Sequence, residues 1–489
     1  LNLCEKRFFM EEETKLVRGL NLFDATTLVI GSMIGSGIFI VPSLMAGYIP
    51  SPGLILLLWV TGGVLTICGA LSYAELAAAM PKAGGPYIYL KEIYSPLMGF
   101  LCGWTVFLVI QSGIIAAVAV AFAKYTGVFL PWISEGTVLL SLPHFTLNSA
   151  QFIGILSIWI LTVINIYGLK SGAFVQNVFT VLKVACVLIL VFCSFLFFKE
   201  GGLNHFSPFF SLKLAEQGIA IGLFGAIAVA MSKALFAYDP WYNVTYVAEE
   251  VENPQRNLPL SLFLGALATM AVYVAATVAY MYVVPINLMS RIPDNRIAAD
   301  VAKTIFGNPG LSFIAAAVMI STFGCNNGLI LGGARILYAT ARDGFFLKKA
   351  ADVHPKFHTP VNALLFQAIW ASILTITNSY SGLLTYVSFA SLLFSSMAVF
   401  GIFIFRKNKP HVERPYKVWG YPVIPALYIL ISIFFIIFIF QGDPRNSLFG
   451  LGLIALGIPV YYHFIKKYQK ITTLLPRNEY RKEECKNEN

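Results

Sequence analysis

Residues 31–39 of the chain read Gly-Ser-Met-Ile-Gly-Ser-Gly-Ile-Phe and lie inside the first long apolar stretch. Each of the three glycines weakens a helix by roughly 1 kcal/mol relative to alanine. In a bilayer, such a weak segment is tolerated only where the freed backbone groups find partners in protein or in a cavity. The stretch therefore predicts a membrane-crossing helix that is interrupted halfway, beside a polar hollow.

A second interruption is expected in the sixth apolar stretch, where residues 236–243 read Phe-Ala-Tyr-Asp-Pro-Trp-Tyr-Asn. Pro240 lacks a backbone donor and clashes with the preceding turn of a helix. Broken or glycine-rich segments also mark tight helix packing. Two breaks five helices apart, however, are typical of transporters built from inverted repeats, whose ligand site lies between the broken helices. We therefore favour a binding site over packing alone.

The composition is typical of a chain that lies almost wholly in a bilayer. Of its 489 residues, 57% are hydrophobic and only 12% are charged, whereas soluble domains carry about 25% charged residues. A helix needs about 20 apolar residues to cross the hydrocarbon. The sequence predicts an all-α membrane protein with twelve transmembrane helices, at roughly 22–46, 54–80, 97–129, 150–168, 173–198, 216–247, 259–284, 310–341, 361–378, 383–405, 421–440 and 447–465.

The two breaks suggest a five-plus-five inverted repeat with discontinuous helices 1 and 6. Helices 11 and 12 would lie outside the repeat. The predicted parts are a cytoplasmic tail at 1–21, a ten-helix transport core at 22–405 with halves 22–198 and 216–405, helices 11 and 12 at 421–465, and a second cytoplasmic tail at 466–489.

Basic residues gather on one side of the predicted helices. With the N-terminus in the cytoplasm, most of the 34 Lys and Arg fall in cytoplasmic loops and tails, as the positive-inside rule predicts. We expect a multi-pass protein of the cell (inner) membrane with both termini in the cytoplasm. Topology then explains the net charge of +10, with membrane lipid as a sufficient partner and no nucleic acid.

The sequence carries no sign of an enzyme. It has no phosphate-binding loop, and its seven scattered Cys show neither zinc spacing nor a disulfide framework. We expect no catalytic residue, no cofactor and no metal. The stretch from Leu1 to Arg18 is charged and lacks the apolar core of a signal peptide, so none is expected there.

The chemistry of the two breaks suits the head group of an amino acid. Amides that open the second half of helix 1 would face a carboxylate, helped by the half-helix dipole, and glycine lets a ligand approach the backbone. Unpaired carbonyls near both breaks could accept from an ammonium. The candidate substrate-binding residues are Met33, Gly35, Ser36, Gly37, Ile38, Phe236, Ala237, Asp239 and Tyr242.

An ordered set of motifs resembles a known family. Residues 35–39, Gly-Ser-Gly-Ile-Phe, resemble the first-helix signature of the amino acid–polyamine–organocation superfamily. Phe-Ala-Tyr at 236–238, followed by Trp241 and by Glu-Glu-Val-Glu-Asn-Pro at 249–254, resembles the L-type amino acid transporter family and its bacterial relatives. The resemblance covers roughly residues 15–465. Further motifs that fit are 83–87, 257–259, 321–324 with Arg335, and 341–344.

This resemblance implies a sodium-independent transporter, an exchanger or facilitator of small neutral L-amino acids that works by alternating access. Ser36 and Gly37 would hold the substrate carboxylate. Carbonyls near Met33 and Phe236 would hold its amine, and Phe236 would act as an aromatic gate over the substrate.

The sixth helix also departs from the family pattern. Pro240 stands where members commonly have glycine and would stiffen the break. Tyr242 stands where some members have asparagine, so it would shrink the side-chain pocket and favour smaller substrates. Asp239 could bind the ammonium directly or cap the following half-helix, and we slightly favour capping.

Lys183 lies well inside the fifth apolar stretch, and an ionisable residue within the membrane is a functional hypothesis by default. The resemblance implies that its ammonium replaces the sodium ion that related transporters hold between helices 1 and 8. Its partners in this ion-site substitute would be the carbonyls near Ile30 and Gly31 and the hydroxyl of Ser321. A purely structural lysine and a proton-coupling lysine remain open.

Two other charges within the apolar stretches receive less functional weight. Lys233 is expected in a solvated vestibule, where it could instead touch an anionic substrate side chain. Glu75 is expected to contact neighbouring backbone or Arg335.

Three functions remain open: the neutral amino acid exchanger or facilitator, a proton-coupled carrier of amino acids or polyamines, and, with less support, a sensor that binds amino acid without transport. Animal members of the family pair with a heavy subunit through a Cys in the loop between helices 3 and 4. Here that loop, Leu130 to Ser149, contains no Cys. We therefore expect no disulfide-linked heavy subunit.

Overall fold

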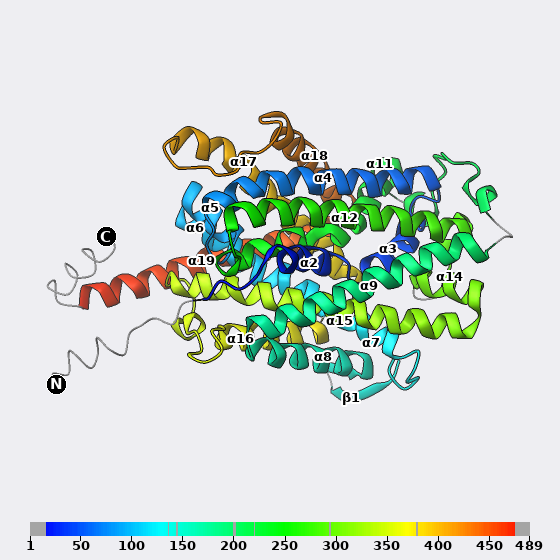
Figure 1. Cartoon of the computed structure of the whole chain (residues 1–489), viewed down its shortest axis with the longest axis horizontal. Coiled ribbons are helices and arrows are strands. Elements are labelled where there is room, and N and C mark those ends of the chain that lie inside the picture. The colour runs from blue at the N-terminus through cyan, green and yellow to red at the C-terminus, as the bar shows by residue number, and fades with distance from the viewer. Residues whose placement is uncertain are drawn as a thin grey trace.

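The long helices of the protein run side by side along one axis of the molecule, and both described chain ends lie at the same end of this bundle (Figure 1). We call this the terminal end, and the other the opposite end. The computed structural model describes residues 16–134, 136–142, 145–198, 202–219, 221–292, 295–377 and 380–474.

Some of the helices that form the bundle consist of two or three consecutive segments. They are α2 (Leu22–Met33) with α3 (Gly37–Ala46), α4 (Pro52–Ala79), α6 (Pro96–Thr105) with the π-helix η1 (Val106–Gln111) and α7 (Ser112–Thr126), α8 (Ser149–Ile166), α9 (Leu169–Phe197), α11 (Gly222–Tyr238) with the 3₁₀ helix η3 (Asp239–Glu250), α12 (Pro254–Val283), α15 (Asn308–Arg342), α16 (Val361–Thr377), α17 (Tyr380–Asn408), α18 (Val423–Gly442) and α19 (Pro444–Leu474). Shorter elements connect them: α5 (Pro86–Ile93), β1 (Val138–Leu142), β2 (Phe145–Asn148), η2 (Gly202–Phe206), α10 (Glu216–Ile219), α13 (Ile286–Met289), α14 (Ile297–Phe306) and η5 (Lys348–Ala351).

Within the described part of the chain, eleven helices are long and apolar enough to span a membrane, and α16 is a shorter apolar helix. The most apolar stretch of α18 has a mean hydropathy of 2.9, yet only 28% of it is buried inside the protein. So much exposed apolar surface is stable only against lipid. The prediction of a helical multi-pass membrane protein is confirmed, whereas the count of twelve helices and the inverted repeat stay predictions.

The first helix is interrupted where the glycines predicted it. α2 begins with a capping box, in which Asn21 and Asp24 each accept the backbone N–H of the other. The helix ends at Met33, and α3 begins at Gly37 after three residues that are not helical. The break therefore leaves the first N–H groups of α3 without acceptors in their own helix.

The sixth helix is also interrupted, but in a form that the sequence did not predict. Instead of unwinding, α11 changes at Asp239 into the 3₁₀ helix η3. Pro240 has a non-helical ψ of 17°, because its ring cannot continue the α-helical turn. The tighter helix places Asp239 and Tyr242 on the same side, since 3₁₀ helices have 3 residues per turn.

Packing brings both breaks into the middle of the bundle. α4 and α12 run side by side in Figure 1 and pack along each other. α15 packs against α2, α7, α9 and η3, while α11 packs against α3, α17 and α18. The breaks are thus enclosed by helices on all these sides.

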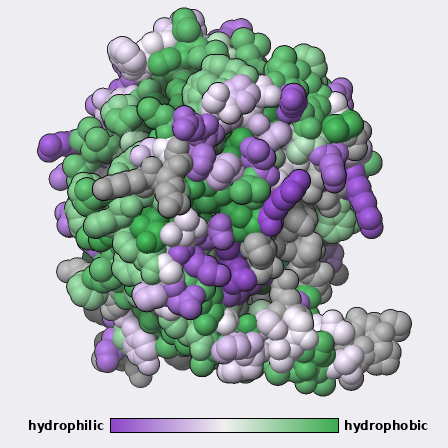
Figure 2. Space-filling view, turned by 90° about the vertical axis from the view of Figure 1, so that its right-hand side faces the viewer, coloured by the Kyte–Doolittle hydropathy of each residue, from purple (hydrophilic) through white to green (hydrophobic). Residues whose placement is uncertain are grey.

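Two features outside the helices complete the fold. β1 and β2 pair antiparallel within the loop between α7 and α8, which the all-α prediction missed. Figure 2 looks onto the opposite end, where hydrophilic side chains gather toward the middle of the face and hydrophobic ones surround them. This pattern is typical of a bundle end that meets water, with an apolar flank in lipid.

Candidate functional site

The two interruptions meet at Gly37 and Ala237. A Cβ added to Gly37 would lie 2.7 Å from the Cβ of Ala237, so only glycine allows this contact. Ser36 and Ile38 are 1% and 0% exposed. The first turn of α3 therefore points its N–H groups into the protein interior, and the predicted binding residues are closed over in this conformation.

Tyr273 of α12 connects the two breaks directly. Its hydroxyl lies 2.6 Å from the Met33 carbonyl oxygen and 3.0 Å from the Ala237 carbonyl oxygen, both of which accept from it. The Phe236 carbonyl accepts the N–H of Asp239. The sequence predicts unpaired carbonyls near both breaks, but in this conformation these three carbonyls are paired. Sequence reasoning missed Tyr273, because a tyrosine in an apolar stretch carries no distinctive signal.

The predicted aromatic gate, Phe236, is buried at the end of α11. Gly35 is equally confined, since a Cβ there would lie 2.8 Å from the Cys325 sulfur on α15. Cys325 itself donates to the Ser32 carbonyl. The glycine-rich segment thus permits close packing of α15 against the break, while the gating role of Phe236 stays a prediction.

Lys183 of α9 is fully buried and reaches the break of the first helix. Its ammonium donates to the carbonyl oxygens of Gly31 at 2.5 Å and Ile34 at 2.7 Å, and a longer contact of 3.4 Å reaches the Ser321 carbonyl. Gly31 is a partner as expected, but Ile34 takes the place expected for Ile30. The Ile30 carbonyl instead accepts the N–H of Ile34.

Lys183 donates to the carbonyl of Ser321 and not to its hydroxyl, contrary to the prediction. The Ser321 hydroxyl donates to the carbonyls of Ile34 and Gly35 at 3.2 and 3.3 Å. The Lys183 ammonium from α9 and the Ser321 hydroxyl from α15 therefore share one acceptor at the break, the Ile34 carbonyl. This arrangement fixes the break between these two helices. The positive charge at the break is the Lys183 ammonium.

Asn243 forms a third link around the breaks. Its side-chain N–H groups donate to the Ser32 hydroxyl and to the Gly328 carbonyl, both at 2.8 Å. Gln111, at the end of the π-helix η1, donates to the Leu329 carbonyl at 2.7 Å. π-Helical turns often mark functional sites. Asn243 belongs to the predicted break at 236–243 but is not among the predicted site residues, although a buried amide in a membrane helix is a usable signal.

The side chain of Asp239 does not cap η3, so the favoured prediction is wrong. Its Oδ1 accepts from the hydroxyl of Ser391 on α17, and no side-chain cap is formed at the start of η3. The Tyr242 hydroxyl lies 2.9 Å from the Ser391 hydroxyl. Both predicted site residues therefore point toward α17, whereas Ala237 faces Gly37.

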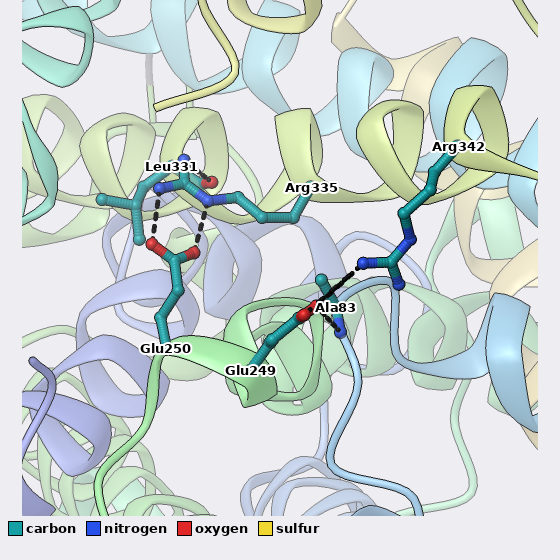
Figure 3. Close-up of polar contacts among 6 residues, drawn as sticks. All are labelled: Ala83, Glu249, Glu250, Leu331, Arg335 and Arg342. Atoms are coloured by element: carbon teal, nitrogen blue, oxygen red, sulfur yellow. Dashed lines mark hydrogen bonds and ion pairs between the residues drawn. The ribbon is translucent and has the colours of Figure 1, made fainter. Parts of the chain in front are cut away.

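Ion pairs close the terminal end of the bundle around the end of η3. Arg335 of α15 binds both oxygens of Glu250, at 2.7 and 3.1 Å, and also donates to the Leu331 carbonyl. Figure 3 shows the two Glu250 oxygens facing the guanidinium, with Glu249 beside it turned toward Arg342. The Arg335–Glu250 pair is almost inaccessible to water, whereas the Arg342–Glu249 pair is partly exposed and 3.4 Å long.

Two expectations about charges need correction. Glu75 accepts the backbone N–H of Val418 at 2.7 Å, in line with one of its two predicted partners. Its ion pair, however, is with Arg406 of α17, at 2.6 and 2.8 Å, and not with Arg335. Lys233 is 6% exposed, so it does not lie in a solvated vestibule. The sequence could not assign the pairs, because helices far apart in the chain supply the partners.

A further cluster of charges lies next to these pairs. Asp343 accepts from Lys91 at 2.7 Å and from the hydroxyl of Tyr87. Burial and the nearby Asp343 carboxylate raise the pKa of Tyr87, so the phenol stays neutral and donates. This cluster joins α5 to the end of α15.

Comparison with known proteins agrees with this geometry. The sequence profile of the family described as amino acid permease matches residues 20–461. The chain is 32% identical to the serine/threonine exchanger SteT of Bacillus subtilis (strain 168), covering 93% of this chain and 99% of the relative. It is 30% identical to the b(0,+)-type amino acid transporter 1 of Mus musculus, covering 92% and 89%. It is 31% identical to the large neutral amino acids transporter small subunit 2 of Homo sapiens, covering 91% and 80%.

Proposed function

The chain belongs to the amino acid permease family, and from this premise we propose that it is a sodium-independent exchanger or facilitator of small neutral L-amino acids that works by alternating access. Proteins of this family are transporters and not enzymes, so the transport of amino acids is the established part. The substrate, the ion independence and the mode of transport are the proposal.

The observation that carries the proposal is the contact between the two interrupted helices. The N-terminal turn of α3 offers N–H groups for a carboxylate. The Met33 and Ala237 carbonyls across the contact accept from Tyr273, and each keeps a second lone pair for an ammonium. A carboxylate and an ammonium are what every amino acid shares. Because Gly37 and Ala237 touch, a substrate enters only after the two breaks separate, which is a requirement of alternating access.

Sodium independence is supported by Lys183. Its ammonium contacts the carbonyls of Gly31 and Ile34 at the break, and such unwound carbonyls are the groups that coordinate sodium in transporters with broken helices. A fixed cation at this point would repel a second one.

A small substrate is supported by the tight surroundings of the breaks. Tyr242 is buried and held by Ser391, which leaves little room for a large side chain beside η3. The relative SteT is named a serine/threonine exchanger. We infer that this chain takes substrates of similar size, such as L-serine and L-threonine.

The second candidate is a proton-coupled carrier of amino acids or polyamines. The Oδ2 atom of Asp239 is buried and has no hydrogen-bond partner among the described residues. A carboxylate oxygen in that state suits a proton or an ammonium. This observation favours the second candidate over a non-transporting sensor.

The topology and the partners complete the proposal. Twelve helices in a five-plus-five inverted repeat, Phe236 as the gate, and termini in the cytoplasm of the inner membrane remain parts of it. The loop at 130–149 contains no Cys, which supports a chain that works without a disulfide-linked heavy subunit.

Counterflow in proteoliposomes tests the proposal. Vesicles preloaded with L-serine should accumulate radiolabelled L-serine without a sodium gradient, and D-serine should compete poorly. Lys183→Ala should lose this exchange or make it depend on sodium, because the carbonyls of Gly31 and Ile34 lose their cation. Unchanged kinetics in this variant would remove the ion-site interpretation, and binding without flux in the wild type would favour a sensor.

A further inference from the structure

A polar cavity lies behind the sixth helix, on the side away from Gly37. α4, α11, η3, α17 and α18 enclose it. Its polar lining consists of Asp239, Thr66, Ser388, Ser391, Ser395 and Tyr428.

Asp239 is the centre of this cavity. Its Oδ1 accepts from the Ser391 hydroxyl, whose single proton is thereby used. Tyr242 must then donate to Ser391 across their 2.9 Å contact, which makes a chain from Tyr242 through Ser391 to Asp239. The Oδ2 atom is buried and, within the described residues, has no hydrogen-bond partner.

Asp239 differs from Glu75 and Glu250, two other buried carboxylates, in having no ion-pair partner among the described residues. Glu75 is paired with Arg406 and Glu250 with Arg335. Asp239 is 6% exposed, and no ion pair with it occurs in the described part of the chain. An unpaired carboxylate in such surroundings is unfavourable, so the cavity is suited to hold a positive charge at Oδ2.

Two other hydroxyls of the cavity, those of Thr66 and Ser388, offer acceptors. Thr66 donates to the Gly62 carbonyl at 2.8 Å and Ser388 to the Ser232 carbonyl at 3.1 Å. Their protons are used, so only lone pairs remain for the cavity. A carboxyl group that carries a proton on Oδ2 is a donor, and it matches these acceptors.

The position of Asp239 links the cavity to the contact between the breaks. Ala237 and Asp239 are two residues apart, which turns their side chains by roughly 200° around the helix. Ala237 touches Gly37, while Asp239 lies at the junction of α11 and η3. Separation of the breaks by an amino acid therefore moves the backbone that carries the carboxyl group.

We propose that the cavity around Asp239 is a proton-binding site, in which Oδ2 takes up a proton that crosses the membrane together with the amino acid. This inference rests on the proposed transport of amino acids. In the step, a hydronium ion on one side gives a proton to the Asp239 carboxylate: one O–H bond of the hydronium ion breaks, leaving water, as the O–H bond at Oδ2 forms. The same bond breaks on the other side, and the proton returns to water, so one positive charge moves with each zwitterion.

The titratable groups around Asp239 are neutral acids. Tyr242 and Tyr246 of η3 and Tyr428 of α18 interact with Asp239, and Tyr73 and Cys68 of α4 lie next to these phenols. Lys233, six residues earlier in α11, interacts with Asp443. Among the described residues, no ion pair of Lys or Arg includes Asp239, so a proton is the charge that completes the site.

A metal ion fits the cavity less well. Calcium and magnesium take about six or more oxygen ligands, including carboxylates, and the described residues contain no cluster of three His, Cys, Asp or Glu. A monovalent alkali cation would use the same carboxylate and lone pairs, so the experiment must separate it from a proton.

Proteoliposomes that contain a pH-sensitive dye provide the test. We expect amino acid uptake by the wild type to acidify the vesicle interior. A pH gradient with the more acidic solution outside should drive accumulation. Asp239→Asn, which keeps the shape but removes the titration, should lose both the substrate-evoked proton signal and the response to the pH gradient, whatever exchange rate remains. Asp300→Asn, the same change in the half-buried α14 outside the spans, should keep both.

The outcomes separate this inference from the proposed function. Net amino acid uptake by the wild type without any proton signal overturns the inference, and persisting counterflow then leaves the exchanger intact, whereas an absence of counterflow overturns the exchanger. A response to sodium or potassium that Asp239→Asn abolishes overturns the proton in favour of an alkali cation.

A spectroscopic measurement tests the proposal even in variants that fold but do not transport. Infrared spectra of the purified protein at neutral pH should show the carbonyl band of a protonated carboxylic acid, lost in Asp239→Asn and shifted in Asp239→Glu. A wild-type spectrum without that band would overturn the proposal.

Discussion

Gly37 is the residue at which the two interrupted helices come closest, so its single hydrogen side chain is a strict requirement. A Cβ would stand 2.7 Å from the Ala237 Cβ, and overpacking of this kind costs about 1–3 kcal/mol. We expect Gly37→Ala to push the breaks apart and to remove most L-serine exchange. Counterflow of the purified variant measures this loss.

A matched glycine provides the control for this prediction. A Cβ at Gly452, in α19, would meet nothing within 4 Å, so Gly452→Ala should exchange at the wild-type rate. Equal losses in the two variants would show that the contact at Gly37 has no special role.

Sequence reasoning succeeded at residues whose chemistry is anomalous for a bilayer. Lys183 and the glycines of residues 31–37 stand out against apolar surroundings, and the structure brings them together. It failed where the direction in which a side chain points decides its partner. Whether Asp239 caps η3 or faces Ser391 depends on the phase of a 3₁₀ helix, and residue types do not reveal that phase.

At the scale of elements, α12 holds the two breaks together through one hydroxyl. Tyr273 bonds Met33 in the first helix and Ala237 in the sixth. Helix–helix hydrogen bonds in membranes contribute about 0.6 kcal/mol each, so Tyr273→Phe should barely change the thermal unfolding temperature. The exchange rate should nevertheless fall, because the relative position of the breaks is no longer fixed.

The same helix supplies the comparison. Tyr280 is also fully buried in α12, but its hydroxyl has no hydrogen-bond partner among the described residues. Tyr280→Phe should therefore leave exchange unchanged. If both variants lose exchange equally, the loss reflects removal of a hydroxyl from α12 in general.

The junction of η3 and α15 allows a test of how the terminal end is closed. Glu250→Gln leaves the buried guanidinium of Arg335 without its countercharge, and removal of one partner from a buried pair costs about 3–5 kcal/mol. Glu249→Gln, at the adjacent position, breaks a partly exposed pair worth about 1 kcal/mol or less. Thermal unfolding in detergent should show a much larger loss for Glu250→Gln, and similar losses would mean that the buried pair does not hold this end closed.

For the whole molecule, hydrophobicity made the membrane fold predictable. The contacts between distant segments could not be predicted in this way. Long apolar stretches such as 259–284 became helices within a few residues of the predicted bounds, as α12 shows. The pairing of Glu75 with Arg406 joins residues more than three hundred positions apart. No local pattern encodes such a pair, because it arises only when the bundle assembles.

Orientation in the membrane is the remaining property of the whole molecule, and charge predicts it. Lys348 is exposed in η5 just after α15, toward the terminal end, whereas Lys213 is exposed between α9 and α11 at the opposite end. If basic residues mark the cytoplasmic side, an impermeant maleimide should label Lys213→Cys in intact cells of a cysteine-free background. Lys348→Cys should react only after the membrane is permeabilised. The reverse pattern would place the terminal end outside, and the buried Arg335–Glu250 pair would then close the external side of the transporter instead of the cytoplasmic one.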